Sequence, residues 1–442
     1  MLTKEQNDLL TLGGPGTAAG ELLRRYWQPV ALAEELPVGG APLPIRLLGE
    51  DLVLFRESCA DGKSYADGES YADGESGRPG LLALHCAHRG ADLSYGRVED
   101  GGLRCLYHGW LYDAAGNCLE QPGEPVGSDF CHKIKQRAYP CQEAGGLIFA
   151  YLGPGEPPLL PAHEFMSAAP DHRFIRKYFQ ESNYLQGNEG NIDPVHLSYL
   201  HRILGDSPEY ARQHLPISGT NEAVPMRFFR KDVAPSIEVE PTDFGVRIFS
   251  IRKAGPDQDY VRISNFIMPN LCAVPGPMGP DGYNINWHVP IDDTHHWKYM
   301  VTFRRGAPLD IDECRRSFEA EISAGYRLIR NATNRYRQDR DEMRVDTQTG
   351  MGSDFIVHDT YATESPGPIQ DRTQEHLGTT DKAISAARQM LLRAIKELPA
   401  GGDPPHVVRD AAANQFPELV VRSEMVPCSE DWRTYWKRSL AA

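Results

Sequence analysis

Two short cysteine–histidine pairs constrain this chain more than any other feature. Cys86 and His88 form the first pair, Cys105 and His108 form the second, and residues 89–104 lie between them. Two thiolates and two imidazoles at this spacing form a four-ligand metal site. Structural zinc is one occupant of such a ligand set, but zinc motifs usually group two Cys and then two His. Because each pair here mixes one Cys with one His, the pattern favours an iron–sulfur centre with two Cys on one iron and two His on the other.

The residues around the two pairs favour the same kind of centre, a Rieske [2Fe–2S] cluster. The sequence RGADL follows the first pair, and Gly109-Trp110 follows the second. From residue 45 to 151, short apolar runs alternate with Gly, Pro and Asp turns, which predicts a small β domain with each pair at a loop tip. The hexapeptide SYADGE, present at 64–69 and again at 70–75, predicts a solvated loop.

The remainder of the chain has a different pattern of predicted helices and strands. A Gly/Pro-rich linker at 153–158 precedes it. Helical patterns are predicted at 188–204, 311–338 and 380–398, and strand-like segments at 226–233, 245–253, 260–268 and 297–305 predict an antiparallel sheet. Strands followed by helices, rather than alternating with them, indicate an α+β fold. We expect an N-terminal helical segment at 1–40, the cluster domain at 41–155 and a catalytic domain at 156–442.

A second group of metal-binding residues lies in the first of these helical patterns. Asp193, His196 and His201 lie close together in the chain. Because one helix face recurs every three or four residues, a spacing of five between the histidines predicts a widened turn. Two His and one carboxylate form the ligand set of mononuclear Fe(II) oxygenases. The segment 355–364 is the best source of the carboxylate, and Asp354 is a weaker candidate.

Several runs together resemble one known family. The run CAHRGADLSYGRVEDGGLRCLYHGW is similar to the Rieske domains of ring-hydroxylating oxygenases. The runs GPGTAAGELLRRYWQPVAL, EGNIDPVHLSYLH, NRYRQDRDEMR and GPIQDRTQEHLGTTDKAI extend the resemblance over nearly the whole chain, to terminal oxygenase alpha subunits of the phthalate dioxygenase-like branch. The SYADGE duplication is the clearest departure.

The resemblance implies an architecture and a set of ligands. A small all-β Rieske domain would precede a helix-grip catalytic domain, an antiparallel sheet with helices around a mononuclear Fe(II). The cluster ligands would be Cys86, His88, Cys105 and His108. The iron ligands would be His196, His201 and Asp359, with Glu364 five residues after the carboxylate. His358 would be a neighbour of the site, and His376 a structural residue.

The resemblance also implies a homotrimer with its subunits arranged head to tail. The cluster of one subunit would lie beside the iron of the next. Asp193 would then link His108 of one subunit to His196 of another and carry a catalytic role. Capping or kinking the helix before Pro194 is the structural alternative for Asp193, and both roles are compatible.

The expected function is that of a terminal oxygenase that uses O₂ and electrons from a separate reductase. No G-x-G-x-x-G fingerprint follows a strand in this chain, so a flavin and iron–sulfur reductase using NAD(P)H is expected as another polypeptide. The substrate would be aromatic, with an aromatic carboxylate favoured, and the reaction hydroxylation or O-demethylation. Four arginines in the strand-rich region could pair with a carboxylate, although a surface position is commoner for each: Arg227, Arg230, Arg247 and Arg262.

Two alternatives from other classes remain open at this level. One is a Rieske electron-transfer protein without oxygenase activity, and the other is a zinc-stapled binding protein. Lys and Arg total 46 against 61 Asp and Glu, which argues against nucleic acid or an anionic membrane as partner. Lacking a membrane-length apolar run and a signal peptide, the chain is expected in the cytoplasm. The other seven cysteines are expected to be free thiols.

Overall fold

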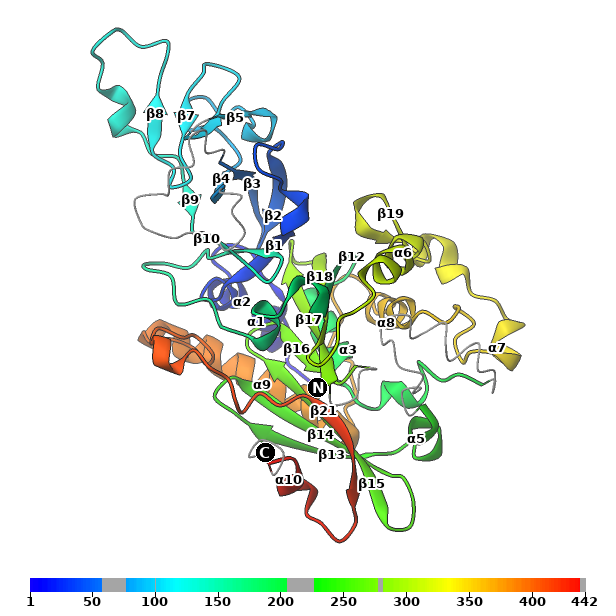
Figure 1. Cartoon of the computed structure of the whole chain (residues 1–442). Helices are drawn as coiled ribbons and strands as arrows, with labels where there is room; N and C mark the ends of the chain where they lie inside the picture. Colours follow the sequence, from blue (N-terminus) through cyan, green and yellow to red (C-terminus); the bar gives the residue numbers. More distant parts are fainter. Residues whose placement is uncertain (58–76, 100, 205–225, 277–280, 438–442) are drawn as a thin grey trace.

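The computed structural model describes residues 1–57, 77–99, 101–204, 226–276 and 281–437. The SYADGE duplication lies outside the described residues, so the loop predicted for it stays a prediction. Figure 1 shows a small β domain at one end of the molecule and a larger sheet with helices at the other. Among the described residues, no helix combines the length and the apolar character that crossing a bilayer requires.

The small domain consists of short antiparallel sheets. One has the order β2 (Leu43–Leu47), β3 (Glu50–Arg56), β4 (Pro79–Ala83), β9 (Ala138–Tyr139). A second has the order β5 (Arg97–Glu99), β6 (Gly102–Arg104), β7 (Leu111–Tyr112), β8 (Cys118–Glu120). A third joins β1 (Gln28–Leu32), β11 (Leu147–Ala150) and β10 (Cys141–Ala144). Buried Phe55, Leu82 and Leu103 form a core shared with Cys86 and Cys105, so the two cysteines are fixed by packing.

The large domain is built on one antiparallel sheet of eight strands. Its path is β12 (Arg173–Gln180), β18 (His296–Arg304), β17 (Gly282–Pro290), β16 (Leu271–Val274), β15 (Gln258–Ile267), β14 (Gly245–Lys253), β13 (Ser236–Pro241). The eighth strand, β21 (Arg422–Pro427), pairs with β15. The α+β class is therefore confirmed, and three of the four predicted strand segments are strands.

Helices cover this sheet. The helix α3 (Tyr184–Ile192) contacts β16, β17 and α8 (Phe355–Glu364), whereas α9 (Lys382–Glu397) contacts β13 and β14. The N-terminal helices α1 (Lys4–Thr11) and α2 (Ala18–Leu23) pack on α9, as Figure 1 also shows. The helix predicted at 380–398 is confirmed as α9, whose buried Ala383, Ala387, Leu391 and Ala394 recur at helical spacing.

Three secondary-structure predictions were wrong. The segment 226–233 begins with a helix, α5 (Met226–Lys231), instead of a strand. The helix predicted at 311–338 ends as α6 (Ile311–Glu321), because Ile322 is extended and Gly325 takes a left-handed φ of 72°. The helix predicted at 188–204 ends at Ile192: Asp193 is extended before Pro194, as the steric demand of proline favours.

One face of the large sheet is polar where it faces α3 and α8. Alternation along β18 places His296, Lys298 and Met300 on the same face. Cross-strand register sets Lys298 opposite His288 and Met300 opposite Asn286. The sheet therefore offers the buried polar side chains of His288, His296 and Lys298 to α3 and to α8, the helix that carries Asp359.

Candidate metal centres

The two cysteine–histidine loops have the same backbone geometry. In the first, Cys86 N–H donates to Ala91 O at 2.8 Å, and Gly90 N–H donates to Cys86 O at 2.8 Å. In the second, Cys105 N–H donates to Trp110 O at 2.8 Å, and Gly109 N–H donates to Cys105 O at 3.0 Å. Both glycines have left-handed φ angles, 72° and 75°, which a side chain would disfavour. The repeated Cys-His-Gly order thus builds two matching loops.

The cysteine and histidine side chains of these loops differ in burial. Both cysteines are 3% exposed, whereas His88 and His108 lie at the surface. The two imidazole rings are 4.4 Å apart, and His88 stacks on Trp110 at 4.3 Å. Tyr112 Oη lies 3.2 Å from Cys86 Sγ. An inner thiol pair and an outer imidazole pair fit a [2Fe–2S] cluster with Cys on one iron and His on the other.

A second metal-binding group lies in the large domain. His201 Nε2 is 3.0 Å and His196 Nε2 is 3.8 Å from Asp359 Oδ1. The ligand atoms of these three residues all lie within 4.8 Å of one another, and no other group of His, Cys, Asp and Glu among the described residues is so arranged. Two His and one carboxylate are the ligands that the sequence predicted for a mononuclear iron.

Short local elements position these three side chains. After α3 ends, a 3₁₀ turn at His196–Ser198 contains the first histidine, and His201 lies in a turn three residues beyond its end, so the predicted widened turn of one continuous helix was wrong. Asp359 lies in the middle of α8. Asp354, the weaker ligand candidate, is instead the N-cap of α8 and accepts from Ile356 N–H at 2.8 Å. Glu364 accepts from Tyr336 Oη at 2.8 Å and is not a member of the group.

The neighbour His358 determines which nitrogen of His201 can bind a metal. His358 Nε2 lies 2.9 Å from Gly352 O, a carbonyl that only accepts, so Nε2 carries the proton. His358 Nδ1 is then an acceptor and receives His201 Nδ1–H at 3.2 Å. His201 Nε2 is left with its lone pair directed at Asp359. Two acceptors facing each other fit a cation between them.

The charge state of the group suits a divalent cation. Burial raises the pKa of Asp359, but the stronger combined effect of His201, Lys298 and His196 holds it well below its usual range. Burial lowers the pKa of His201 despite the nearby carboxylate. Lys298, which the sequence analysis missed, places Nζ 3.7 Å from Asp359 Oδ2. The sequence feature that could have indicated Lys298 is a lysine that alternates with apolar residues in a strand expected to be buried. A carboxylate and neutral imidazoles are the protonation states that bind metal.

Asp193 lies beside this group without belonging to it. Its Oδ1 accepts from Val195 N–H at 2.7 Å, and its Oδ2 lies 3.9 Å from His196 Nδ1. His196 Nδ1 is buried with no hydrogen-bond partner among the described residues. Within the described part of this chain, Asp193 also makes no contact with His108. The turn-forming role of Asp193 is thus observed.

A cavity of about 920 Å³, part of it open to solvent, adjoins the three candidate ligands. Besides the three candidate ligands, polar side chains from the sheet and from the end of α3 line it: Asn191, Asp193, Ser250, Arg262, Ser264, Asn284, Asn286 and Lys298. Of the four arginines considered, Arg262 lines the cavity. Arg247 pairs with Glu240 at 3.0 Å, and Arg230 donates to Ile203 O at 3.4 Å. The side chain of Arg227 is not among those that the structure describes.

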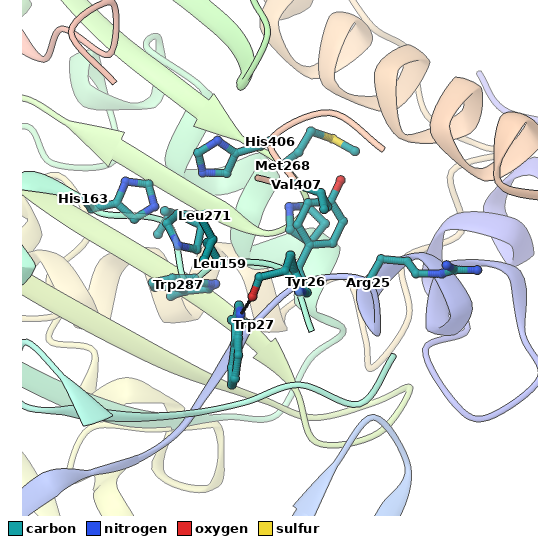
Figure 2. Close-up of a pocket in the computed structure, with 13 residues that line it drawn as sticks. Arg25, Tyr26, Trp27, Leu159, His163, Met268, Leu271, Trp287, His406 and Val407 are labelled. Carbon is teal, nitrogen blue, oxygen red and sulfur yellow. Dashed lines mark hydrogen bonds between the residues drawn. The ribbon is translucent and has the colours of Figure 1, made fainter. Parts of the chain in front are cut away.

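A smaller cavity of about 330 Å³ shares no lining residue with the first (Figure 2). Apolar and aromatic side chains such as Trp27, Leu271 and Trp287 line it, together with His163 and His406. Burial lowers the pKa of His163 to about 4 and that of His406 well below its usual value. With no carboxylate in its lining, this cavity lacks the donor set of an oxygenase centre.

A β domain with paired Cys-His loops, joined to a sheet-and-helix domain with two His and one carboxylate beside a cavity, defines a Rieske non-haem iron oxygenase. The model of the Rieske [2Fe-2S] domain matches residues 26–135, and that of the "LigXa C-terminal domain like" family matches residues 150–441. The chain therefore belongs to the Rieske non-haem iron oxygenases, in their phthalate dioxygenase-like branch.

Individual relatives agree with this assignment. The phthalate 4,5-dioxygenase oxygenase subunit of Pseudomonas putida is 33% identical over 99% of this chain and 95% of its own length. The 5,5'-dehydrodivanillate O-demethylase oxygenase subunit of Sphingobium sp. (strain NBRC 103272 / SYK-6) is 34% identical over 94% and 85%. A solved complex of the oxygenase and ferredoxin of carbazole 1,9a-dioxygenase has a similar fold, with TM-score 0.54, 21% identity and 93% and 97% coverage.

The expected enzyme class and cofactor types are thereby confirmed. The chain is an oxygenase with a Rieske [2Fe–2S] domain, in a family that uses a mononuclear iron for catalysis. The carrier and zinc-protein alternatives do not agree with this family.

Proposed function

We propose that this terminal oxygenase hydroxylates or O-demethylates an aromatic carboxylate at an iron held by His196, His201 and Asp359. Cys86, His88, Cys105 and His108 would hold the cluster that supplies electrons. Fe(II) with open coordination positions provides the oxygen chemistry when it is bound. The chain's own residues bind and orient the substrate and exclude water. The observation that carries the proposal is the convergence of the three ligand atoms at the wall of the polar cavity.

The cavity contains a cation suited to a substrate carboxylate. Arg262 is buried, donates to Pro275 O at 3.1 Å and stacks over Phe229 at 5.4 Å. Among the described residues, Arg262 forms no ion pair with a carboxylate, and Asp193 and Asp359 line the same cavity. Burial and the charge of Arg262 lower the pKa of the neighbouring Arg252 to about 10. An arginine fork in such surroundings supports a bidentate contact with a carboxylate ligand.

Metal analysis tests the ligand assignment. The wild type is expected to hold about three irons per chain, two in the cluster and one at the catalytic site. His196→Ala should reduce this to about two and abolish oxidation of benzoates, while the cluster's electron paramagnetic resonance signal persists. The half-buried His172, which bonds Arg304 O, provides the control variant His172→Ala. A wild type with two irons contradicts the proposal.

We also propose a homotrimer in which Asp193 links His196 to His108 of a neighbouring subunit. Three features support this link: the unpartnered His196 Nδ1, the nearby Asp193 carboxylate and the surface position of His108. Leu106 and Tyr107 beside His108 are 60% and 56% exposed, and apolar surface of this kind marks contact sites. The proposal also includes a separate reductase with flavin and an iron–sulfur cluster as electron donor, and the cytoplasm as location. It further includes the domain bounds 1–40, 41–155 and 156–442.

Substitution of Asp193 tests the link. Asp193→Asn keeps the size of the side chain but removes its charge, so both metals should stay bound while turnover falls at least about tenfold through slower electron transfer. Single-turnover reduction and oxidation of the cluster measures this step directly, and sedimentation measures the trimer. Unchanged electron transfer in the variant, or a monomeric wild type, contradicts the proposed link.

A further inference from the structure

A row of buried hydrogen bonds leads across the sheet to the cavity at Asn191. His296 Nδ1 lies 2.7 Å from Ser182 O, and His296 Nε2 lies 3.0 Å from His288 Nδ1. His288 Nε2 lies 2.6 Å from Asn191 Oδ1. Both histidines are almost fully buried, at 1% and 0% exposure, and neither is a candidate ligand of the metal centres. Asn191 lines the cavity beside His196 and Asp359.

Helix α3 is shaped to receive this histidine pair. Gly187 lies one helical turn before Asn191 and therefore on the same face. A Cβ at Gly187 would lie 2.2 Å from His288 Nδ1 and 2.8 Å from His296 Nε2. The helix can approach the pair only because residue 187 has no side chain, so the contact between the pair and Asn191 is a property of the packing.

The direction of each hydrogen bond follows from the carbonyl at the start of the row. Ser182 O only accepts, so His296 carries its proton on Nδ1 and accepts at Nε2. His288 then donates from Nδ1 and accepts at Nε2. Burial, the main cause, lowers the pKa of both rings, so neither carries a second proton. The Asn191 amide must therefore donate its NH₂ group to His288, which a half-turn about its Cβ–Cγ bond allows.

We propose that Asn191 is a specificity-determining residue whose amide oxygen faces the cavity and accepts a hydrogen bond from a substrate hydroxyl. His288 and His296 are positioning residues that fix this orientation. The inference rests on the proposed function, since Arg262 would hold the carboxylate of the same substrate. It narrows the substrate class to aromatic acids that also carry a hydroxyl group. A site built for a hydroxyl discriminates strongly against an analogue without one, because its polar group is left unpaired.

Calorimetric titration of the iron-loaded enzyme with matched ligands tests the proposal. The ligands are 2-, 3- and 4-hydroxybenzoate and the three corresponding fluorobenzoates, which have similar size but no donor. At least one hydroxybenzoate should bind about tenfold more tightly than its fluoro counterpart, and Asn191→Leu should reduce this ratio to about twofold or less.

The ratio of the affinities for hydroxybenzoate and fluorobenzoate also tests the positioning role of His288 and His296. His288→Phe releases the amide and should lower the preference for hydroxybenzoate, but should have no further effect when added to Asn191→Leu. The buried His406 of the second cavity (Figure 2) provides the matched control His406→Phe, which should leave the ratio unchanged.

Two results overturn the inference, and they are distinguishable. Wild-type enzyme that binds benzoates with equal affinity for each hydroxy and fluoro pair contradicts the role of Asn191 and leaves the proposed function intact. Enzyme that binds none of the six acids contradicts both. A folded Asn191→Leu enzyme that keeps the wild-type ratio likewise contradicts the role of Asn191 and leaves the proposed function intact.

Discussion

At the scale of single residues, hydrogen bonds beyond the ligands prepare the nitrogen that a metal needs. The bond from His201 to His358, together with the bond from His358 to Gly352 O, leaves His201 Nε2 unprotonated. Phe355 stacks on the His201 ring at 4.3 Å and fixes its plane. The His201 ring, a proposed iron ligand, is thus oriented from two sides by the protein itself.

Replacing His358 should weaken iron binding without removing a ligand. His358→Leu leaves His201 Nδ1–H without its acceptor in a buried place, and the affinity for the mononuclear iron should fall about 10–100-fold. Competition with a chelator measures the affinity, and the cluster's spectrum reports on the rest of the protein. Iron affinity equal to that of the wild type would show that His358 only fills space.

At the scale of elements, α3 determines where the segment with the proposed iron ligands begins. Glu189 on this helix accepts from Arg372 Nη2 at 2.8 Å and also pairs with Arg388 on α9. Burial raises the pKa of Glu189, but the effect of Arg372 and then Arg388 is larger, and the pKa is lowered overall. The ion pairs hold the helix against the C-terminal segment, four residues before Asp193.

Neutralising Glu189 should destabilise the large domain. Glu189→Gln leaves buried Arg372 without its carboxylate, and the loss of one partner of a buried pair costs about 3–5 kcal/mol. Denaturant titration followed by tryptophan fluorescence measures the loss. Half-buried Glu238, 3.5 Å from Lys382, provides the control Glu238→Gln, which should change stability by less than about 1 kcal/mol. Similar losses in both variants would contradict the anchoring role.

At the scale of the whole molecule, buried histidines other than the proposed metal ligands link stability to pH. Burial lowers the pKa of His163 to about 4 and that of His296 to about 4, against about 6.5 in the unfolded chain. Between these values the unfolded chain binds protons that the folded protein does not. Stability therefore falls as the pH decreases from about 6.5 towards 4.

Acid titration should reveal these histidines. Each one contributes about 1.4 kcal/mol of lost stability per pH unit below about 6.5. Denaturation midpoints should therefore fall between pH 6.5 and 5, and His163→Gln should make that slope shallower by about one proton. Between pH 7.5 and 8.5 these histidines should not change the dependence of the denaturation midpoint on pH, and this range is the internal control. An unchanged slope in His163→Gln would contradict the prediction.

Local sequence predicted secondary structure well only where the pattern was regular and the element was packed as the pattern implied. The Ala- and Leu-rich repeat of α9 became a helix, and the apolar runs of β14, β15 and β18 became strands. The segment of α5 was mistaken for a strand because Phe228 and Phe229 suit either structure and packing against Tyr260 decides between them. Pro194 ended the helix that the pattern continued.

The sequence by itself grouped the residues of the two Cys-His loops and the pair His196 and His201, because each group lies within a few covalently linked residues, although the widened helical turn predicted for the two histidines was wrong. The assignment of Asp359 came from the resemblance to a family, and packing of α8 on α3 brings it to the histidines. Only the tertiary structure decided the roles of Lys298, His358 and the row from Ser182 to Asn191. Their contacts join strands and helices far apart in the chain, and a single histidine or lysine on a strand carries no periodic signal of the partner it will meet.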